Sequence, residues 1–257
     1  MSVSLRSAIR NTPVLGPILH HAYLRMLHDE GKVLTISDGS LRGYRWIRFS
    51  RTFDPKYADG SWEIEIQRVL EKYLQPGMTF YDVGAHGGFF ALLGAKLVGS
   101  TGNVICFEAH PATAKCCRRE LEINSITNVD VINAAVSDSA GVVTFYEGPC
   151  PSMASLVLEH GNAMSIPAIT LDDMIESHPT PRVIKMDIEG GEARALKGAR
   201  KLLTKVRPIL ITEIHGAEGE EYCREIEKFD YRNEPIALGL GRQLFWRTNG
   251  QVLSVPQ

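Results

Sequence analysis

The sequence has no large excess of charge of either sign, no long apolar run and no Cys-x-x-Cys pair. Its 28 basic and 30 acidic residues leave a net charge of −2, which disfavours a dedicated nucleic-acid binder. The apolar patch from Val14 to Leu19 is interrupted by Gly16 and Pro17. It is too short and too broken for a membrane span or a signal peptide, so we expect neither.

The cysteines give no framework for disulfides or zinc. There are 5, an odd count, and none stands in a Cys-x-x-Cys pair. This usage indicates a reducing compartment, and we expect the protein to be cytoplasmic. With 44% hydrophobic residues over 257 positions, the chain suits one large α/β domain better than two equal ones.

From about residue 78, short apolar runs typical of buried strands alternate with helix-like segments. Such alternation predicts a doubly wound α/β fold, in which helices cover both faces of a mostly parallel sheet. The expected strands are Met78–Ala85, Asn103–Glu108, Val129–Val136, Val183–Ile188 and Pro208–Ile214. The expected helices are Phe89–Val98, Ala112–Asn124, Leu171–Ser177, Glu192–Thr204 and Glu218–Phe229. Residues 76–257 would form this domain.

The remaining segments carry weaker patterns. Pro235–Leu240 and Gln243–Val255 read as an antiparallel C-terminal hairpin, Val142–Glu147 as an extra strand and Pro149–Pro167 as a long loop. Residues 1–75 read as an N-terminal extension or lid. Within it we expect a helix over Gln67–Leu74 and a hairpin around Tyr44–Phe53.

The segment Asp82-Val-Gly-Ala-His-Gly-Gly carries the clearest functional signal. An apolar strand runs into Gly84, Gly87 and Gly88 before a helix, as in nucleotide-binding βα turns. The next strand ends at Glu108, where a carboxylate can accept hydrogen bonds from ribose hydroxyls. A dinucleotide site would have glycine in place of His86, so that the pyrophosphate can sit on the helix N-terminus.

The charge at this turn favours a different cofactor. A carboxylate at Asp82 would repel pyrophosphate but suits a ligand that carries an ammonium or sulfonium group. S-adenosylmethionine has both, together with a ribose for Glu108. The alternative is an ordinary tight turn whose aspartate is satisfied locally. The combination with Glu108 favours a methyl-donor site.

Further motifs follow in one order along the chain. They are Phe107-Glu108-Ala-His-Pro111, Asn133-Ala-Ala-Val-Ser-Asp138, Thr170-Leu-Asp-Asp173, Lys185-Met-Asp-Ile-Glu-Gly-Gly-Glu192 and Leu196-Lys-Gly-Ala199. Over about residues 62–216 the chain thereby resembles the FkbM family of S-adenosylmethionine-dependent methyltransferases, mostly regarded as O-methyltransferases. The resemblance implies the seven-stranded sheet of class I methyltransferases. His86 departs from the family, which more often has asparagine there.

The resemblance also implies roles for single residues. Asp82, Gly84, His86 and Gly88 would line the methionine part of the cofactor, and Glu108 would bind the ribose. The backbone around Ala135 would lie near the adenine. Asp138 is a second adenine contact by this resemblance, although an aspartate shortly before Gly141 is equally typical of a turn.

Polar side chains at two strand ends supply the candidate chemistry. The ends of parallel strands meet at one edge of the sheet. The side chains expected to converge there, opposite the methyl donor, are Asp187, Glu189, Glu213 and His215. His215 is the first candidate for the base, because its ordinary pKa lies nearest neutrality. Asp187 would orient the acceptor or act as base itself. Alternatively these groups hold Mg²⁺ or Mn²⁺, which would acidify a hydroxyl; no motif fixes a metal.

The sequence thus predicts an S-adenosylmethionine-dependent O-methyltransferase. Its partner would be a hydroxyl acceptor, small or carrier-bound, such as a sugar, polyketide or other secondary metabolite. A nitrogen or macromolecular acceptor is the first alternative, but the Asn/Asp-Pro-Pro-Tyr loop typical of nitrogen acceptors is replaced by Asp187-Ile-Glu-Gly190. A non-catalytic binding module is the other. Neither the acceptor nor the oligomeric state can be deduced from the sequence.

Overall fold

The computed structural model describes residues 31–48, 54–146, 163–215, 218–236 and 250–257. They belong to two compact units, and the boundary along the chain lies between Trp62 and Glu63. The smaller unit contains an antiparallel hairpin of β1 (Val33–Thr35) and β2 (Arg45–Ile47), followed by the short helix α3 (Pro55–Asp59). The hairpin begins earlier than expected, and residues 49–53 of the predicted one lie outside the described residues. The proposed lid role of residues 1–75 stays a prediction.

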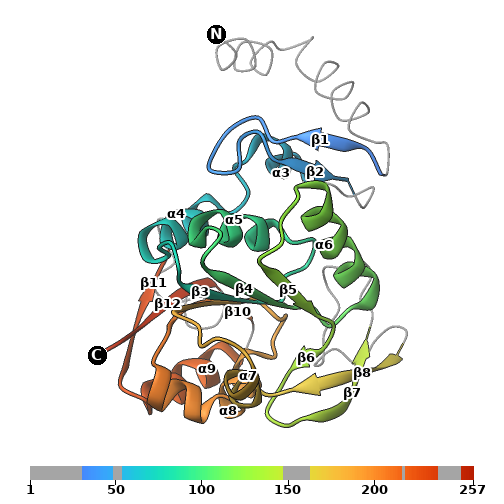
Figure 1. The fold of residues 1–257 in the computed structure, drawn as a ribbon. Coiled ribbons are helices and arrows are strands. Elements are labelled where there is room, and N and C mark those ends of the chain that lie inside the picture. Colours follow the sequence, from blue (N-terminus) through green and yellow to red (C-terminus); the bar gives the residue numbers. More distant parts are fainter. Residues whose placement is uncertain (1–30, 49–53, 147–162, 216–217, 237–249) are drawn as a thin grey trace, which may run out of the picture. The chain divides into compact units, whose positions relative to one another are not determined.

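The larger unit is built on a seven-stranded sheet with the order β11-β12-β10-β9-β3-β4-β5 (Figure 1). Five strands are parallel, and β12 alone runs antiparallel to both of its neighbours. The parallel strands are β3 (Thr79–Val83), β4 (Asn103–Phe107), β5 (Val129–Ile132), β9 (Val183–Met186) and β10 (Ile209–Ile214). The last two strands are β11 (Tyr231–Pro235) and β12 (Gly250–Pro256). The predicted mostly parallel, doubly wound sheet with an antiparallel C-terminal pair is confirmed.

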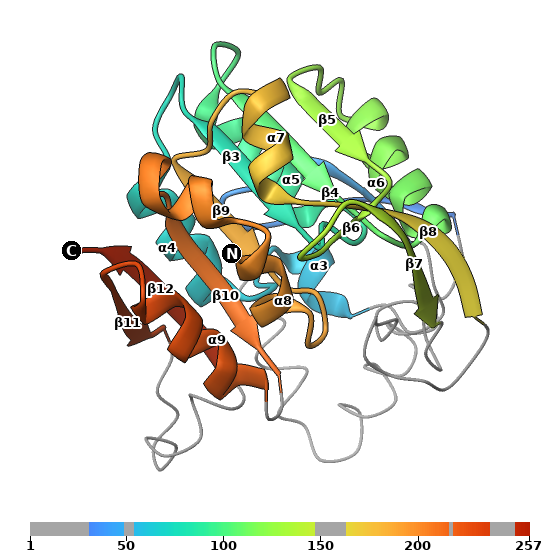
Figure 2. The same ribbon diagram turned by 90° about the horizontal axis from the view of Figure 1, so that it is seen from below.

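Helices cover both faces of this sheet. Figure 1 shows α4 (Ile64–Tyr73), α5 (Phe89–Val98) and α6 (Pro111–Ile123) on one face. On the other face, seen from the front in Figure 2, lie α7 (Leu171–Ser177), α8 (Glu192–Lys197) and α9 (Glu218–Glu227). Because both faces are covered, every residue of β3 and β9 is buried. Among the helices that the structure describes, none has the length and apolar character needed to cross a bilayer.

A three-stranded sheet is inserted between β5 and α7. Its strands are β6 (Ala135–Val136), β7 (Gly141–Tyr146) and β8 (Ala163–Ile169), with β8 in the middle. The single strand predicted over Val129–Val136 is therefore wrong. The amide of Asn133 donates to the backbone carbonyls of Glu108 and Ala109, at 2.8 and 2.9 Å, and the chain leaves the large sheet there. The loop predicted over Pro149–Pro167 ends earlier, because β8 begins at Ala163.

Two other element boundaries differ from expectation. The helix predicted over Glu192–Thr204 stops at Gly198, and a short π-helix (Leu202–Val206) follows. A Cβ at Gly198 would collide with the carbonyl of Ser137, so the chain packs tightly at this break. The C-terminal strands pair as predicted but lie at Tyr231–Pro235 and Gly250–Pro256. The turn expected at Gly239 and Gly241 lies outside the described residues.

The order in which the parallel strands are added reverses between β3 and β9. From β3 the chain moves outward through β4 to β5, and it then returns to the other side of β3 as β9. In open parallel sheets, ligands bind beyond the carboxyl ends of the strands at such a switch point. The strands on either side of it lead into the segments that begin at Gly84 and at Asp187. Both are segments in which the sequence places functional residues.

Candidate active site

The turn after β3 is packed closely against the end of β9. Gly84 has a φ of +80°, and a Cβ there would collide with the carbonyl oxygen of Asp187. His86 has a φ of +48°, in the left-handed region where asparagine and histidine are both enriched. The position that departs from the family thus keeps a residue suited to the same backbone conformation. Gly88 directly precedes α5 as its N-cap, and a Cβ there would collide with the Cys117 side chain.

Asp82 is the most unusual side chain of the site. It is fully buried, and neither carboxylate oxygen has a hydrogen-bond partner among the described residues. Burial raises the pKa of Asp82 to about 6; the ammonium of Lys185 opposes the shift, and the carboxylates of Asp187 and Glu108 add to it. A buried carboxylate without a partner is costly, so this group is suited to a cationic ligand.

Glu108 stands at the end of β4 and closes the turn. Its two oxygens accept hydrogen bonds from the backbone N–H groups of His86 (2.8 Å) and His110 (2.9 Å). Burial raises the pKa of Glu108, and these two hydrogen bonds limit the rise. Carboxylate oxygens have further lone pairs, so Glu108 can still accept from a hydroxyl.

The two candidate adenine contacts differ in their surroundings. Ala135 is buried on β6 and belongs to a small apolar cluster against which Ala109 packs, directly after Glu108. Asp138 is exposed at the turn between β6 and β7, where it accepts from the hydroxyls of Ser137 and Ser139, at 3.1 and 3.3 Å. Its observed contacts are those of a turn residue.

Lys185 lies at the centre of the charged cluster, and the sequence analysis missed it. Its ammonium is 3.3 Å from a carboxylate oxygen of Asp187 and 3.5 Å from the carbonyl of Gly84, and it lies over the Phe90 ring. Burial would lower the pKa of Lys185, but the neighbouring carboxylates, Asp187 and Asp82 foremost, raise it above its usual value. The lysine is therefore charged. A lysine inside a strand buried on both faces was the signal available in the sequence.

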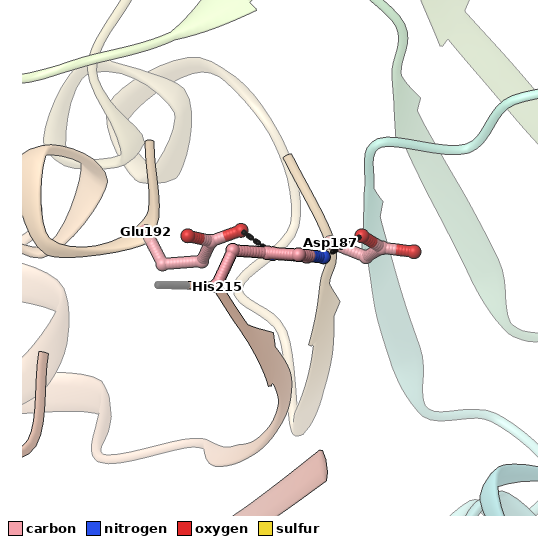
Figure 3. A group of neighbouring side chains, drawn as sticks. All are labelled: Asp187, Glu192 and His215. Carbon is pink, nitrogen blue, oxygen red and sulfur yellow. Dashed lines mark hydrogen bonds and ion pairs between the residues drawn. The ribbon is translucent and has the colours of Figure 1, made fainter. Parts of the chain in front are cut away.

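His215, at the end of β10, is surrounded by carboxylates. Its Nε2 is 3.9 Å from Asp187, 3.7 Å from Glu189 and 3.9 Å from Glu213. Its Nδ1 is 3.3 Å from a carboxylate oxygen of Glu192. Figure 3 marks this contact with a dashed line. The expected convergence of Asp187, Glu213 and His215 is thus present. Glu192, buried at the start of α8, is a member that the sequence did not distinguish from an ordinary helix-terminal acid.

The charges around His215 set its protonation. Burial alone would lower the pKa of His215, but the hydrogen bond and charge of Glu192, with the charge of Asp187, raise it to about 9. At neutral pH the ring is an imidazolium. Burial and the charge of Asp187 raise the pKa of Glu213. These surroundings favour a protonated His215, which can donate a hydrogen bond, and make Glu213 a better proton acceptor than an ordinary glutamate.

A further acid of this cluster, Glu63, directly precedes α4. Its Oε2 is buried and has no hydrogen-bond partner among the described residues. Burial raises the pKa of Glu63 to about 7; Lys185 opposes the shift, and Asp187 adds to it. Its sequence pattern does not differ from that of a surface residue, because its burial follows from the tertiary fold.

The fold and the site together define a class of protein, a doubly wound α/β protein with a cluster of buried charged groups at the switch point of its sheet. The model of the methyltransferase FkbM domain matches residues 82–233, which is more than half of the chain. The chain belongs to the FkbM methyltransferase domain family.

Individual relatives are more distant. The hexuronic acid methyltransferase AglP of Haloferax volcanii is 28% identical over 155 residues, covering 60% of this chain and 62% of that protein. The chain therefore spans less than two thirds of the length of this curated relative.

Solved structures show looser likenesses. A methyltransferase FkbM from Methylobacillus flagellatus is 17% identical, with a TM-score of 0.48 over 73% of this chain and 50% of that one. An S-adenosylmethionine-dependent O-methyltransferase from Thermotoga maritima is 12% identical, with a TM-score of 0.47 over 88% and 78%. These likenesses are too loose to add to what the strand order shows.

Proposed function

We propose that the chain is an S-adenosylmethionine-dependent methyltransferase that methylates a hydroxyl of a small or carrier-bound acceptor, with sugars as the first class to test. The buried carboxylate of Asp82 carries this proposal. It lies at the end of β3, and neither of its oxygens has a hydrogen-bond partner among the described residues. The ammonium of the methyl donor would supply that partner, whereas the pyrophosphate of a dinucleotide would be repelled.

The rest of the donor site fits the same ligand. Glu108 has spare acceptor capacity for ribose hydroxyls, and its bonds to the His86 and His110 N–H groups hold it in place. Ala135, Gly84 and His86 would line the ligand through their backbone. When bound, S-adenosylmethionine supplies a methyl group carried on a positively charged sulfonium. Once the methyl group is transferred, the sulfur is left as an uncharged thioether.

On the acceptor side, the chain must orient a hydroxyl and take its proton. His215 was the first candidate for the base, but an imidazolium cannot accept that proton. We therefore assign proton removal to Glu213. Its pKa is raised towards neutral pH, which makes its carboxylate a stronger base than an ordinary one. His215 would hold the acceptor oxygen as a hydrogen-bond donor, and Asp187, paired with Lys185, would orient it.

The sugar assignment is supported by the relative from Haloferax volcanii, whose printed name is hexuronic acid methyltransferase. The test is transfer of a labelled methyl group from S-adenosylmethionine to glucose and to glucuronic acid. We expect product with at least one of them, and a large loss of kcat in Glu213→Gln. Glu176→Gln, which removes a surface partner of Lys201, is the control. Binding of the donor without transfer to any sugar, polyketide or amine would favour a binding module.

A divalent cation is the second candidate component. Asp187, Glu192 and His215 each offer a ligand atom within 4.8 Å of the others. However, the Glu192 oxygen already accepts two backbone N–H groups, and the His215 ring would first have to lose its proton. We therefore propose a reaction that needs no metal.

A further inference from the structure

One carboxylate oxygen of Glu192, at the start of α8, contacts both the turn after β9 and His215 at the end of β10. Glu192 is the first residue of α8, and its side chain is only 2% exposed. Its Oε1 accepts hydrogen bonds from the backbone N–H groups of Ile188 (3.0 Å) and Gly190 (3.3 Å). The same oxygen is 3.3 Å from Nδ1 of His215.

The two backbone donors flank a strained residue. Glu189 has a φ of +54°, in the left-handed region that a side chain with a Cβ rarely adopts. Such a conformation persists only where its surroundings hold it. By binding the N–H groups on both sides, Glu192 fixes the turn that brings the Glu189 carboxylate to 3.7 Å from Nε2 of His215.

The third bond orients the imidazolium. With Nδ1 held by Glu192, Nε2 is directed at Asp187, Glu189 and Glu213, all within 4 Å (Figure 3 shows the Asp187 and Glu192 side chains). In a free side chain the ring could flip or turn about χ2. The bond therefore decides which nitrogen faces the proposed acceptor position.

We infer that Glu192 is a positioning residue for methyl transfer, which holds the Asp187–Gly190 turn and the His215 ring in their working geometry without contacting the acceptor. This inference rests on the proposed function. Stabilisation of the helix dipole would be served by a solvent-exposed acid, and it requires no contact with His215. A positioning role explains both features of Glu192, its buried carboxylate and its three hydrogen-bond donors.

The test compares Glu192→Ala and Glu192→Gln with the control Glu221→Gln. Glutamine keeps a carbonyl oxygen that can accept the same three hydrogen bonds, whereas alanine removes them. The control removes the surface partner of Lys197, which lies on the same helix α8. The readouts are S-adenosylmethionine affinity by calorimetry, kcat and KM with glucuronic acid or glucose, and the NMR signal of the His215 Nδ1 proton.

We expect kcat to fall about 100-fold in Glu192→Ala, the scale of a small misplacement of reacting groups, and glutamine to restore at least about tenfold of it. We expect affinity for the donor to stay unchanged in both, because the hydrogen bonds of Glu192 go to Ile188, Gly190 and His215 and not to the turn after β3. The downfield Nδ1 proton signal persists with glutamine and disappears with alanine. Glu221→Gln behaves as wild type.

Two results would overturn the inference. One is wild-type kcat in both variants. The other is a parallel loss of donor affinity, kcat and melting temperature in both, which indicates a purely structural role. If the wild type neither binds the donor nor transfers methyl groups, the proposed function fails separately. The Nδ1 signal then decides: loss of the signal with alanine alone supports the positioning geometry, and the same signal in all variants contradicts it.

Discussion

Binding of the methyl donor should depend on pH through Asp82. In the free protein its pKa is about 6, because the carboxyl is fully buried and its charged form is poorly solvated. The cationic ligand binds the ionised form. Affinity should therefore be constant above pH 7 and fall by up to about tenfold per pH unit below 6, so that Kd is about tenfold weaker at pH 5 than at pH 7.

The same shift has the opposite effect on the stability of the free protein. A carboxyl whose folded pKa is raised from 3.8 to about 6 binds more protons in the folded than in the unfolded state between these values. Its contribution to the free energy of unfolding is therefore fully present below pH 3.8. It is lost as the pH rises through 6, with a total of about 3 kcal/mol. Donor binding should restore part of this loss.

Calorimetry and urea unfolding at pH 5, 6 and 7 test both effects in wild type, Asp82→Asn and Glu63→Gln. Asp82→Asn should bind the donor about 10- to 100-fold more weakly at pH 7, the loss of one charged hydrogen bond, and its affinity should not change near pH 6. Glu63→Gln removes the neighbouring group with a pKa of about 7 and should leave the inflection near 6. Equal wild-type affinity at pH 5 and 7, or an inflection retained in Asp82→Asn, refutes the reasoning.

Three further predictions follow from the same cluster. Lys185→Met leaves buried carboxylates without a counter-charge and should lower the free energy of unfolding by about 3–5 kcal/mol at pH 7, with a smaller loss at pH 5 where Asp82 is protonated; urea titration at both pH values measures it. Glu108→Ala removes the acceptor of two backbone N–H groups and the proposed ribose contact, so calorimetry should show at least about tenfold weaker donor binding. Treatment with EDTA should leave donor affinity and kcat unchanged, and a loss restored by Mg²⁺ would establish the metal site instead.

Elements with local start signals could be predicted from the sequence. Helix α7 has the predicted bounds Leu171–Ser177, and Thr170 caps it: its hydroxyl accepts from the Asp173 N–H and donates to the Asp173 carboxylate. Helix α5 begins directly after Gly88, also as predicted. Where a boundary depends on distant contacts, the prediction failed. Val129–Val136 is apolar apart from Asp130 and Asn133, and it is divided in two because the Asn133 amide donates to backbone carbonyls just after β4.

The candidate site likewise has features that the sequence predicts and features that depend on tertiary contacts. The convergence of Asp187, Glu213 and His215 follows from strand alternation and from the common edge of a parallel sheet, both visible in the sequence. The roles of Glu192 and Glu63 do not follow from it, because a charged residue at a helix start has the same pattern whether it is solvated or buried beside a partner. Lys185 differs, because a lysine inside an apolar strand run is itself a signal. The pKa of His215 also depends on the carboxylates of Glu192, Asp187 and Glu189, so its ordinary value was a poor guide.

The central claim is that the turn after β3 binds S-adenosylmethionine. Titration calorimetry of the wild-type protein with S-adenosylmethionine and with NAD⁺, at pH 7.5 after EDTA treatment, tests it most directly. We predict micromolar binding of the methyl donor and no binding of NAD⁺, because the Asp82 carboxylate would pair with an ammonium and repel a pyrophosphate. Binding of NAD⁺, or of neither ligand, would contradict the account.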